Sequence, residues 1–240
     1  MRFFVTCLLF PVSLLADTLG GGSWNGFSYA VTTNAAAGNG PTLLVASWTN
    51  TTSLADMVFS LTSVPVGALI TIVEVDEGAE NARPVQVTGG SGTWDNSLTA
   101  FAATSGNMTM VTNAAHGGGN FNVTVTAGGN HAMSGIFVMI NWAMGAATSA
   151  TGKAIPNVSI TPQKAGSLAI VGISDWAAKP GPFTYTNSPT ILHTDDQSGA
   201  GAYVGYICYY TNVTASAQYM GVAAPGSQQA GIGVQEIKAP

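Results

Sequence analysis

The sequence predicts an all-β protein: an antiparallel β-sandwich, jelly-roll-like, with about a dozen strands and little helix. Charged residues make up only 7% of the 240 residues, against about 25% in an average domain. Exposed helix faces are normally rich in Glu, Lys and Arg, so few helices are expected. Glycine is abundant at 30 residues. From Pro41 onward, short runs of β-branched and aromatic residues alternate with Gly, Asn, Ser and Pro clusters, which is typical of a sandwich.

The first 40 residues differ in character from the rest of the chain. Residues 3–16 are apolar, follow Arg2 and are too short for a membrane-spanning helix. They fit either a secretory signal that ends after Ala16 or an arm that docks on the body or on a neighbouring subunit, and the sequence leaves both open. Residues 17–40 are rich in Gly, Asn and Thr, so we expect a connector there.

Hydrophobic periodicity predicts the strands. Residues 121–126 alternate strictly, which places Phe121, Val123 and Val125 on a core face. Residues 85–88 and 158–161 alternate in the same way. Three runs are apolar on both faces and predict central strands, at residues 136–142, 168–171 and 204–208. Further strands are expected at residues 42–48, 57–62, 68–75, 107–112, 183–186, 217–223 and 231–237.

The chain divides loosely near residues 146–156, but composition does not change there. The two halves share only a loose plan of strand, turn and strand, which falls short of a recognisable repeat. We therefore expect one sandwich domain over residues 41–240, with halves that interleave.

Charge excludes several classes of function. The formal net charge is −5 at pH 7 and the isoelectric point is about 4.8, so there is no basic surface for nucleic acid or for an anionic membrane. Intrinsic disorder combines low hydrophobicity with high charge, and this chain has neither. We expect a folded protein with a neutral polar surface rich in Thr, Ser, Asn and Gly.

The candidates for catalysis are few. His116 and His131 lie in Gly-rich sequences typical of turns, where an exposed or capping histidine is expected. His193 is followed by Thr194, Asp195 and Asp196, which could coordinate a cation, but no further ligand follows at a recognisable spacing.

The acidic residues cluster at one place. Glu74, Asp76, Glu77 and Glu80 are four of the eleven acids within seven residues. They could hold Ca²⁺ through oxygen ligands, but they lack the ligand pattern of a helix-loop-helix calcium site. We expect a polar hairpin tip, and we identify residues 74–80 as the first place to look for a partner or a cation.

Aromatic residues suggest either sugar binding or plugs that close the ends of the sandwich. Trp24, Trp94 and Trp176 lie beside polar residues, and Asp95 and Asp175 could accept hydrogen bonds from a sugar. The plug is the favoured interpretation. Further amphipathic aromatic residues are Phe183, Tyr185, Tyr209 and Tyr210.

The two cysteines are 201 positions apart in the sequence. Cys7 belongs to the apolar N-terminal stretch and Cys208 to a strand-like run. We expect two free buried thiols that act as small apolar side chains.

The order of several segments resembles a β-sandwich module of tailed-phage minor tail and fibre proteins and of related bacterial surface proteins. The segments are a turn before Thr93 and Trp94, an Ala/Gly hairpin at residues 108–119, the strand at 123–126 and the apolar strand at 136–142. The second half of the module is matched by residues 165–171, 203–210 and 231–237. Coverage runs over residues 41–240 and is weakest at 49–80.

This resemblance implies a non-enzymatic virion structural protein of a tailed bacteriophage, in the tail tip or a fibre, with a role in host attachment. Its partners would be other virion subunits, copies of itself in a trimer, and host surface glycans. The alternative is a secreted bacterial carbohydrate-binding or adhesin module at the cell surface. No catalytic residue, cofactor-binding residue or metal ligand is assigned from the sequence.

Overall fold

The computed structural model describes residues 29–32, 43–50, 56–79, 86–102, 105–126, 130–176, 183–196 and 203–240. These residues form seventeen strands and no helix, which confirms the predicted all-β class and exceeds the expected number of strands. Within this part of the chain there is accordingly no helix long and apolar enough to cross a membrane. The apolar segment 3–16 and its predicted cleavage or docking lie outside the described residues.

The first half of the chain forms a sandwich of two sheets. The first outer sheet has the order β1-β3-β8-β5, and the first inner sheet has the order β2-β9-β4-β7-β6. All pairs are antiparallel except β1 with β3. The strands are β1 (Tyr29–Thr32), β2 (Leu43–Asn50), β3 (Asp56–Val64), β4 (Ala68–Ala79), β5 (Gln86–Thr88), β6 (Asp95–Phe101), β7 (Ser105–His116), β8 (Gly119–Thr126) and β9 (Asn130–Met139).

The second half repeats this topology strand for strand. The second inner sheet has the order β10-β17-β12-β15-β14 and the second outer sheet the order β11-β16-β13, so each strand from β2 to β9 has its counterpart eight strands later. In both halves the chain alternates between the two sheets except at the β6–β7 and β14–β15 hairpins, and β2 pairs with β9 as β10 pairs with β17, as in a jelly roll. The strands are β10 (Ala143–Lys153), β11 (Asn157–Ile160), β12 (Ser167–Asp175), β13 (Thr184–Tyr185), β14 (Thr190–Asp196), β15 (Val204–Val213), β16 (Gln218–Ala224) and β17 (Ala230–Lys238).

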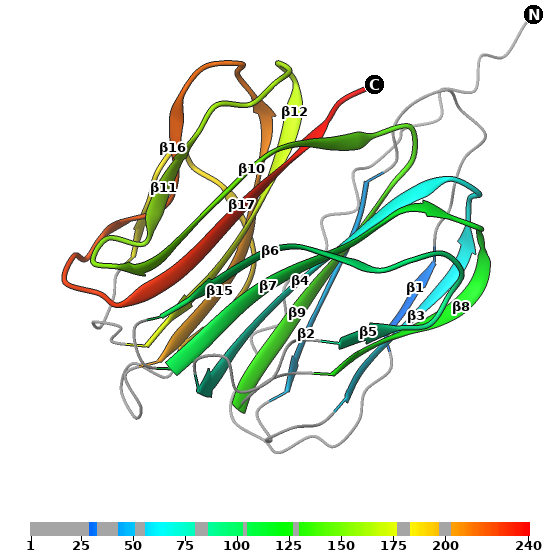
Figure 1. Cartoon of the computed structure of the whole chain (residues 1–240), viewed down its shortest axis with the longest axis horizontal. Helices are drawn as coiled ribbons and strands as arrows, with labels where there is room; N and C mark the ends of the chain where they lie inside the picture. The colour runs from blue at the N-terminus through cyan, green and yellow to red at the C-terminus, as the bar shows by residue number, and fades with distance from the viewer. Residues whose placement is uncertain are drawn as a thin grey trace, which may run out of the picture.

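Three apolar layers fill the spaces between the four sheets. Phe59 and Val125 belong to the layer inside the first sandwich, and Tyr206 belongs to the layer inside the second. The middle layer joins the two inner sheets and contains Phe137 from the first and Ile170 from the second. Figure 1 shows the result, with the strands of the first half, blue to green, beside those of the second half, lime to red.

Two sandwiches therefore follow one another and share a core, and no sheet mixes strands from the two halves. The expectation of interleaved halves was wrong, because the pairing of first and last strands closes each sandwich on itself. The boundary also differs: residues 146–156 include most of β10, and the chain passes from one half to the other at residues 140–142.

Matching positions recur in the two halves. Gly67 and Gly166 precede the equivalent strands β4 and β12 with φ angles of 78° and 81°, a left-handed backbone that glycine adopts without strain. Asp76 and Asp175, close to the ends of those strands, are both fully buried. The two halves therefore repeat the same strand topology, and only a few equivalent positions carry the same residue.

The predicted core faces agree with the structure where alternation was strict. Val123 and Val125 are buried, while Asn122, which precedes Val123 on β8, is exposed. The runs predicted as central lie in β9, β12 and β15, each paired on both sides, except that residues 140–142 of the first run follow β9 and belong to no strand. Cys208 is a free buried thiol, as expected, and Cys7 lies outside the described residues.

Candidate functional site

A cluster of acidic residues around a histidine lies where the two sandwiches meet. His131 on β9 places Nε2 3.4 Å from Glu77 Oε2 of β4 and Nδ1 3.5 Å from Asp195 Oδ2 of β14. Glu77 and His131 belong to the first sandwich and Asp195 to the second, so this acid–histidine cluster bridges the inner sheets. Each contact is an ion pair only when the imidazole carries a proton, and its single positive charge offsets one of the two carboxylates.

Burial shapes the titration of the groups around this cluster. It raises the pKa of Glu77, which His131 opposes, and the nearby carboxylates of Asp195 and Asp76 raise it further. Burial lowers the pKa of His193, against the opposing effect of Asp195. Both shifts are in the direction that disfavours the charged form in a low dielectric.

Tyr203, the residue before β15, lies against His131 of the acid–histidine cluster. Its ring centroid lies 6.1 Å from that of His131, and its side chain is fully buried. Burial raises its pKa well above the ordinary value, and the carboxylates of Asp76, Glu74 and Asp195 add to the effect. The Tyr203 phenol therefore stays protonated at neutral pH, and its ring contacts His131 across the junction of the two sandwiches.

The structure brings together residues that the sequence treated as separate candidates. Glu77, His131 and Asp195 came from the acidic stretch, a Gly-rich turn and the stretch after His193, and no spacing in the sequence joined them. His131 was expected in a turn but lies within β9, with a left-handed φ of 47°. Glu80 and the side chains of His116 and Asp196 lie outside the described residues.

The acidic stretch is not the expected hairpin tip, because Glu74 and Asp76 lie within β4 and are fully buried. Asp76 Oδ1 accepts hydrogen bonds from the Gly78 N–H at 2.6 Å and from Asn107 Nδ2 at 2.9 Å. Neither carboxylate oxygen of Glu74 has a hydrogen-bond partner among the described residues. Burial and the neighbouring Asp76 raise the pKa of Glu74 well above its ordinary value.

The aromatic candidates are mostly packing residues, which favours the plug interpretation. Trp94 packs on the core of the first sandwich and donates its Nε1–H to the Gly89 carbonyl at 2.9 Å. Phe183 and Tyr185 pack edge-on against Tyr206 in the core of the second sandwich. Tyr209 contacts Phe137 of the middle layer, and the Tyr210 hydroxyl accepts the Gly221 N–H.

The remaining candidates for sugar contacts are separated from one another. Trp176 is half-buried, with its backbone N–H bonded to the Gln229 carbonyl. Asp175 is buried and accepts the Gln229 N–H, whereas Asp95 is exposed at the start of β6. Trp24 lies outside the described residues. Within the described ranges, no three His, Cys, Asp or Glu side chains form a group that could hold a metal ion.

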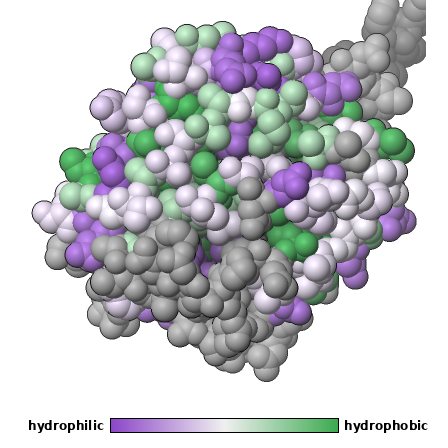
Figure 2. Space-filling view, in the orientation of Figure 1, coloured by the Kyte–Doolittle hydropathy of each residue, from purple (hydrophilic) through white to green (hydrophobic). Residues whose placement is uncertain are grey.

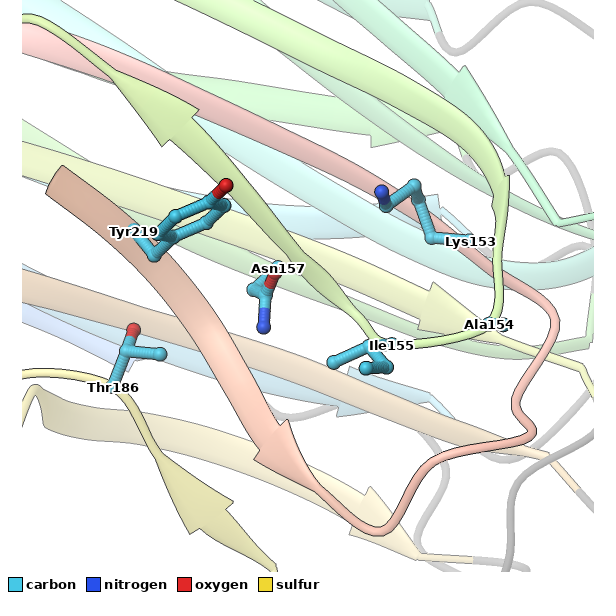
Figure 3. A pocket seen from close by; sticks show the side chains of 6 residues that line it. All are labelled: Lys153, Ala154, Ile155, Asn157, Thr186 and Tyr219. Atoms are coloured by element: carbon cyan, nitrogen blue, oxygen red, sulfur yellow. The ribbon is translucent and has the colours of Figure 1, made fainter. Parts of the chain in front are cut away.

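A shallow depression that sequence reasoning missed lies on the second sandwich. Its volume is about 550 Å³, and Figure 3 shows it with Tyr219 of β16 on one side and Lys153 of β10 on the other. The Tyr219 side chain is 60% exposed and Ile155 is 44% exposed. Asn157 and Thr186 also line the depression, and their side chains donate to the Val222 and Gly221 carbonyls. An exposed aromatic ring beside an amide, a hydroxyl and an ammonium is suited to contact with a neutral polar ligand.

No protein-family model matches the chain, and neither does any curated protein or solved structure. The fold and the two candidate sites define an all-β protein built from two jelly-roll sandwiches in tandem.

Proposed function

We propose that the protein is a non-enzymatic structural component of a tailed-bacteriophage particle, in the tail tip or a fibre, that also contributes to host-surface attachment. The observation that carries the proposal is the tandem of two jelly rolls joined through their inner sheets. Jelly rolls serve as building blocks of virus particles and as lectin domains. The sequence resemblance to phage tail and fibre modules points to the first use, and fold alone does not decide between them.

The surface supports a role in packing and contact. Figure 2 shows one face on which pale colours of intermediate hydropathy predominate, with small purple and green areas scattered among them. This agrees with a chain in which only 7% of residues are charged. Neutral Thr, Ser, Asn and Gly side chains have a low desolvation cost compared with charged ones, which suits subunit contacts.

The test is the protein content of purified particles. Mass spectrometry of gradient-purified phage that encodes the chain should detect it at a constant ratio to known tail proteins. Its presence only in the lysate supernatant would refute the proposal, because a virion component must co-purify with the particle.

We propose further that the chain assembles with copies of itself, as a trimer around the tail axis. β10 is an edge strand that pairs with β17 on one side, and it carries no charge before Lys153. Natural monomers usually protect such an edge with charges, Pro or bulges. Here two irregularities protect the ends of β10 and leave residues 147–150 in regular pairing.

Light scattering of the full chain tests this assembly. The wild type should show a mass of about three chains, and Ser149→Lys, which adds a charge to an exposed position of the edge, should shift it toward one chain. The matched control is Thr151→Lys near the irregular end. A monomeric wild type would contradict the proposed trimer, but it would not decide whether the protein belongs to the phage particle, which mass spectrometry tests separately.

The second candidate is a secreted carbohydrate-binding or adhesin module, which the depression around Tyr219 favours. A sugar ring stacked on Tyr219 could exchange hydrogen bonds with Asn157, Thr186 and Lys153. Glycan arrays with the wild type, Tyr219→Ala and the control Trp94→Phe discriminate the two uses. Saturable binding that only Tyr219→Ala abolishes supports a glycan site, and binding that persists in Tyr219→Ala rejects this location.

A further inference from the structure

The two sandwiches differ at one side. In the first, β1 adds a strand at the edge of the outer sheet, parallel to β3, with Tyr29 opposite Phe59 (Figure 1). β1 also contacts β2, so it lies across the side of the sandwich between the two sheets. The counterparts of β3 and β2 in the second sandwich are β11 and β10. Among the described residues, no strand pairs with the side of β11 that corresponds to the β1 side of β3.

The backbone of β11 presents hydrogen-bonding groups at this open edge. On its other side β11 pairs with β16, with Val158 opposite Met220. The Val222 N–H donates to the Pro156 carbonyl, and successive residues of an antiparallel strand turn their backbone groups alternately toward and away from the partner. The N–H and C=O of Ser159 therefore point away from β16, and Ser159 is exposed.

Apolar side chains of the second core lie close to the surface along the same side. Ala146 and Ala150 of β10 and Val158 of β11 pack against this core but are only half-buried. β11 itself carries no charged residue that would protect its edge. An added strand would supply backbone hydrogen bonds and cover the apolar side chains together, which is the mode of recognition in which a peptide extends a sheet.

The chain contains a segment with the character that this edge requires. Residues 3–9, Phe-Phe-Val-Thr-Cys-Leu-Leu, are uncharged, rich in residues that favour strands and free of proline. Residues 10–28 link them to β1, and a linker of that length spans at most about 65 Å when extended, enough to reach a neighbouring subunit. We propose that the open edge of β11 binds residues 3–9 of a second copy of the chain as an added strand, parallel to β11 as β1 is to β3.

This inference deepens the proposed self-assembly and rests on it, but it does not depend on the role in the virion. β10, the edge strand proposed above as a subunit contact, contacts β11 and borders the same side of the second sandwich. The added strand and the β10 edge would therefore belong to one interface. Each copy gives one segment and accepts one, which is a head-to-tail contact that can close into a ring.

Cross-linking of the full chain tests where residues 3–9 bind. Cys7 belongs to the segment, whereas Cys208, the other cysteine, is fully buried. A short bismaleimide should join Cys7 of one copy to the new thiol of Ser159→Cys in the next and give dimers and trimers on a denaturing gel. The control is Thr88→Cys, exposed on β5 at an edge of the first outer sheet, which should give none. Products confined to single chains, or equal yields in the two variants, would overturn the proposal.

A proline at the edge provides an independent readout. Ser159→Pro removes the N–H that points toward the added strand and leaves the pairing of Val158 with β16 in place, so light scattering should show a mass shifted from about three chains toward one. Ser159→Ala is the matched control, because it keeps the N–H and should assemble like the wild type. Cross-linking of Ser159→Cys decides the question if Ser159→Pro folds poorly.

The outcomes separate this inference from the proposals made above. A trimeric wild type whose Ser159→Cys variant forms no cross-link would overturn the added strand and leave the trimer standing, whereas a monomeric wild type would overturn both. Natural protein whose intact mass shows a start at Asp17 would also overturn the added strand, because residues 3–9 would be absent. Mass spectrometry of purified particles tests the role in the virion separately.

Discussion

The contact between the two inner sheets depends on glycine at position 172, so Gly172→Ala should separate the sheets locally. Gly172 lies on β12 and pairs with Gly233 of β17. A Cβ atom at Gly172 would lie 2.6 Å from Val73 Cγ1 and 2.8 Å from Met108 Cγ, both across the middle layer. Met108 is flexible, but Val73 is β-branched and buried, so it has little freedom to move.

The expected loss follows from two opposing effects. Overpacking of a filled core costs about 1–3 kcal/mol. Replacing glycine by alanine in an ordinary backbone conformation returns about 0.4–1 kcal/mol by restricting the unfolded chain. The net destabilisation should therefore be about 1–2 kcal/mol, or roughly 2–8 °C in melting temperature for a chain of this size.

Thermal and urea unfolding of the full chain measure this change. Gly226→Ala is the matched control, because the nearest atom to its added Cβ is Ile155 Cγ1 at 3.9 Å, and it should be neutral or slightly stabilising. The double variant Gly172→Ala/Val73→Ala should lose less stability than the sum of the losses in the two single variants, because Val73→Ala makes room for the Cβ atom added at position 172. Equal stability of Gly172→Ala and Gly226→Ala would refute close packing of the inner sheets.

Three further predictions concern single titratable groups. Burial opposes it, but backbone N–H groups of Gln163, Ala146 and Lys164 lower the pKa of Glu236. The contribution of the Glu236 carboxylate to folding stability is therefore present above the unfolded pKa near 4.5 and is lost as pH falls below it. Urea titration at pH 7 should show that Glu236→Gln costs about 1–3 kcal/mol. Burial raises the pKa of Cys208 to about 12, so its peptide should resist iodoacetamide at pH 8 until the protein unfolds; rapid labelling of the native state would contradict its burial. Because the folded pKa of Glu74 is raised, the wild type should lose stability as pH rises above about 4.5, and Glu74→Gln should be the more stable chain at pH 7 and not at pH 4.

Local pattern was sufficient where one face of a strand is core and the other is solvent. The alternation at residues 121–126 gave the correct faces of β8, because burial there repeats with the period of the strand. The same logic missed β10, whose small residues carry little hydrophobic contrast, and β6, which has polar residues at its start. The tandem repeat was also missed, because equivalent positions such as Glu74 and Ile173 differ in chemistry although their places in the topology agree.

The candidate sites depend on distances that only the fold sets. Clustered acids usually stay hydrated, so the sequence predicted a hairpin tip at residues 74–80. Nothing in the local sequence indicates that a strand would bury Glu74 and Asp76. Glu77, His131 and Asp195 are separated from one another by more than fifty residues in the sequence and meet because the two inner sheets pack face to face. The exposed ring of Tyr219 had no distinguishing sequence context at all.

The role in the virion is tested most directly by locating the protein on the particle. Antibodies raised against the full chain, coupled to gold and imaged by electron microscopy on purified phage, should label one end of the tail or its fibres. Labelling absent from every particle, with the antigen recovered only from bacterial culture fluid, would contradict the account and favour the secreted glycan-binding alternative.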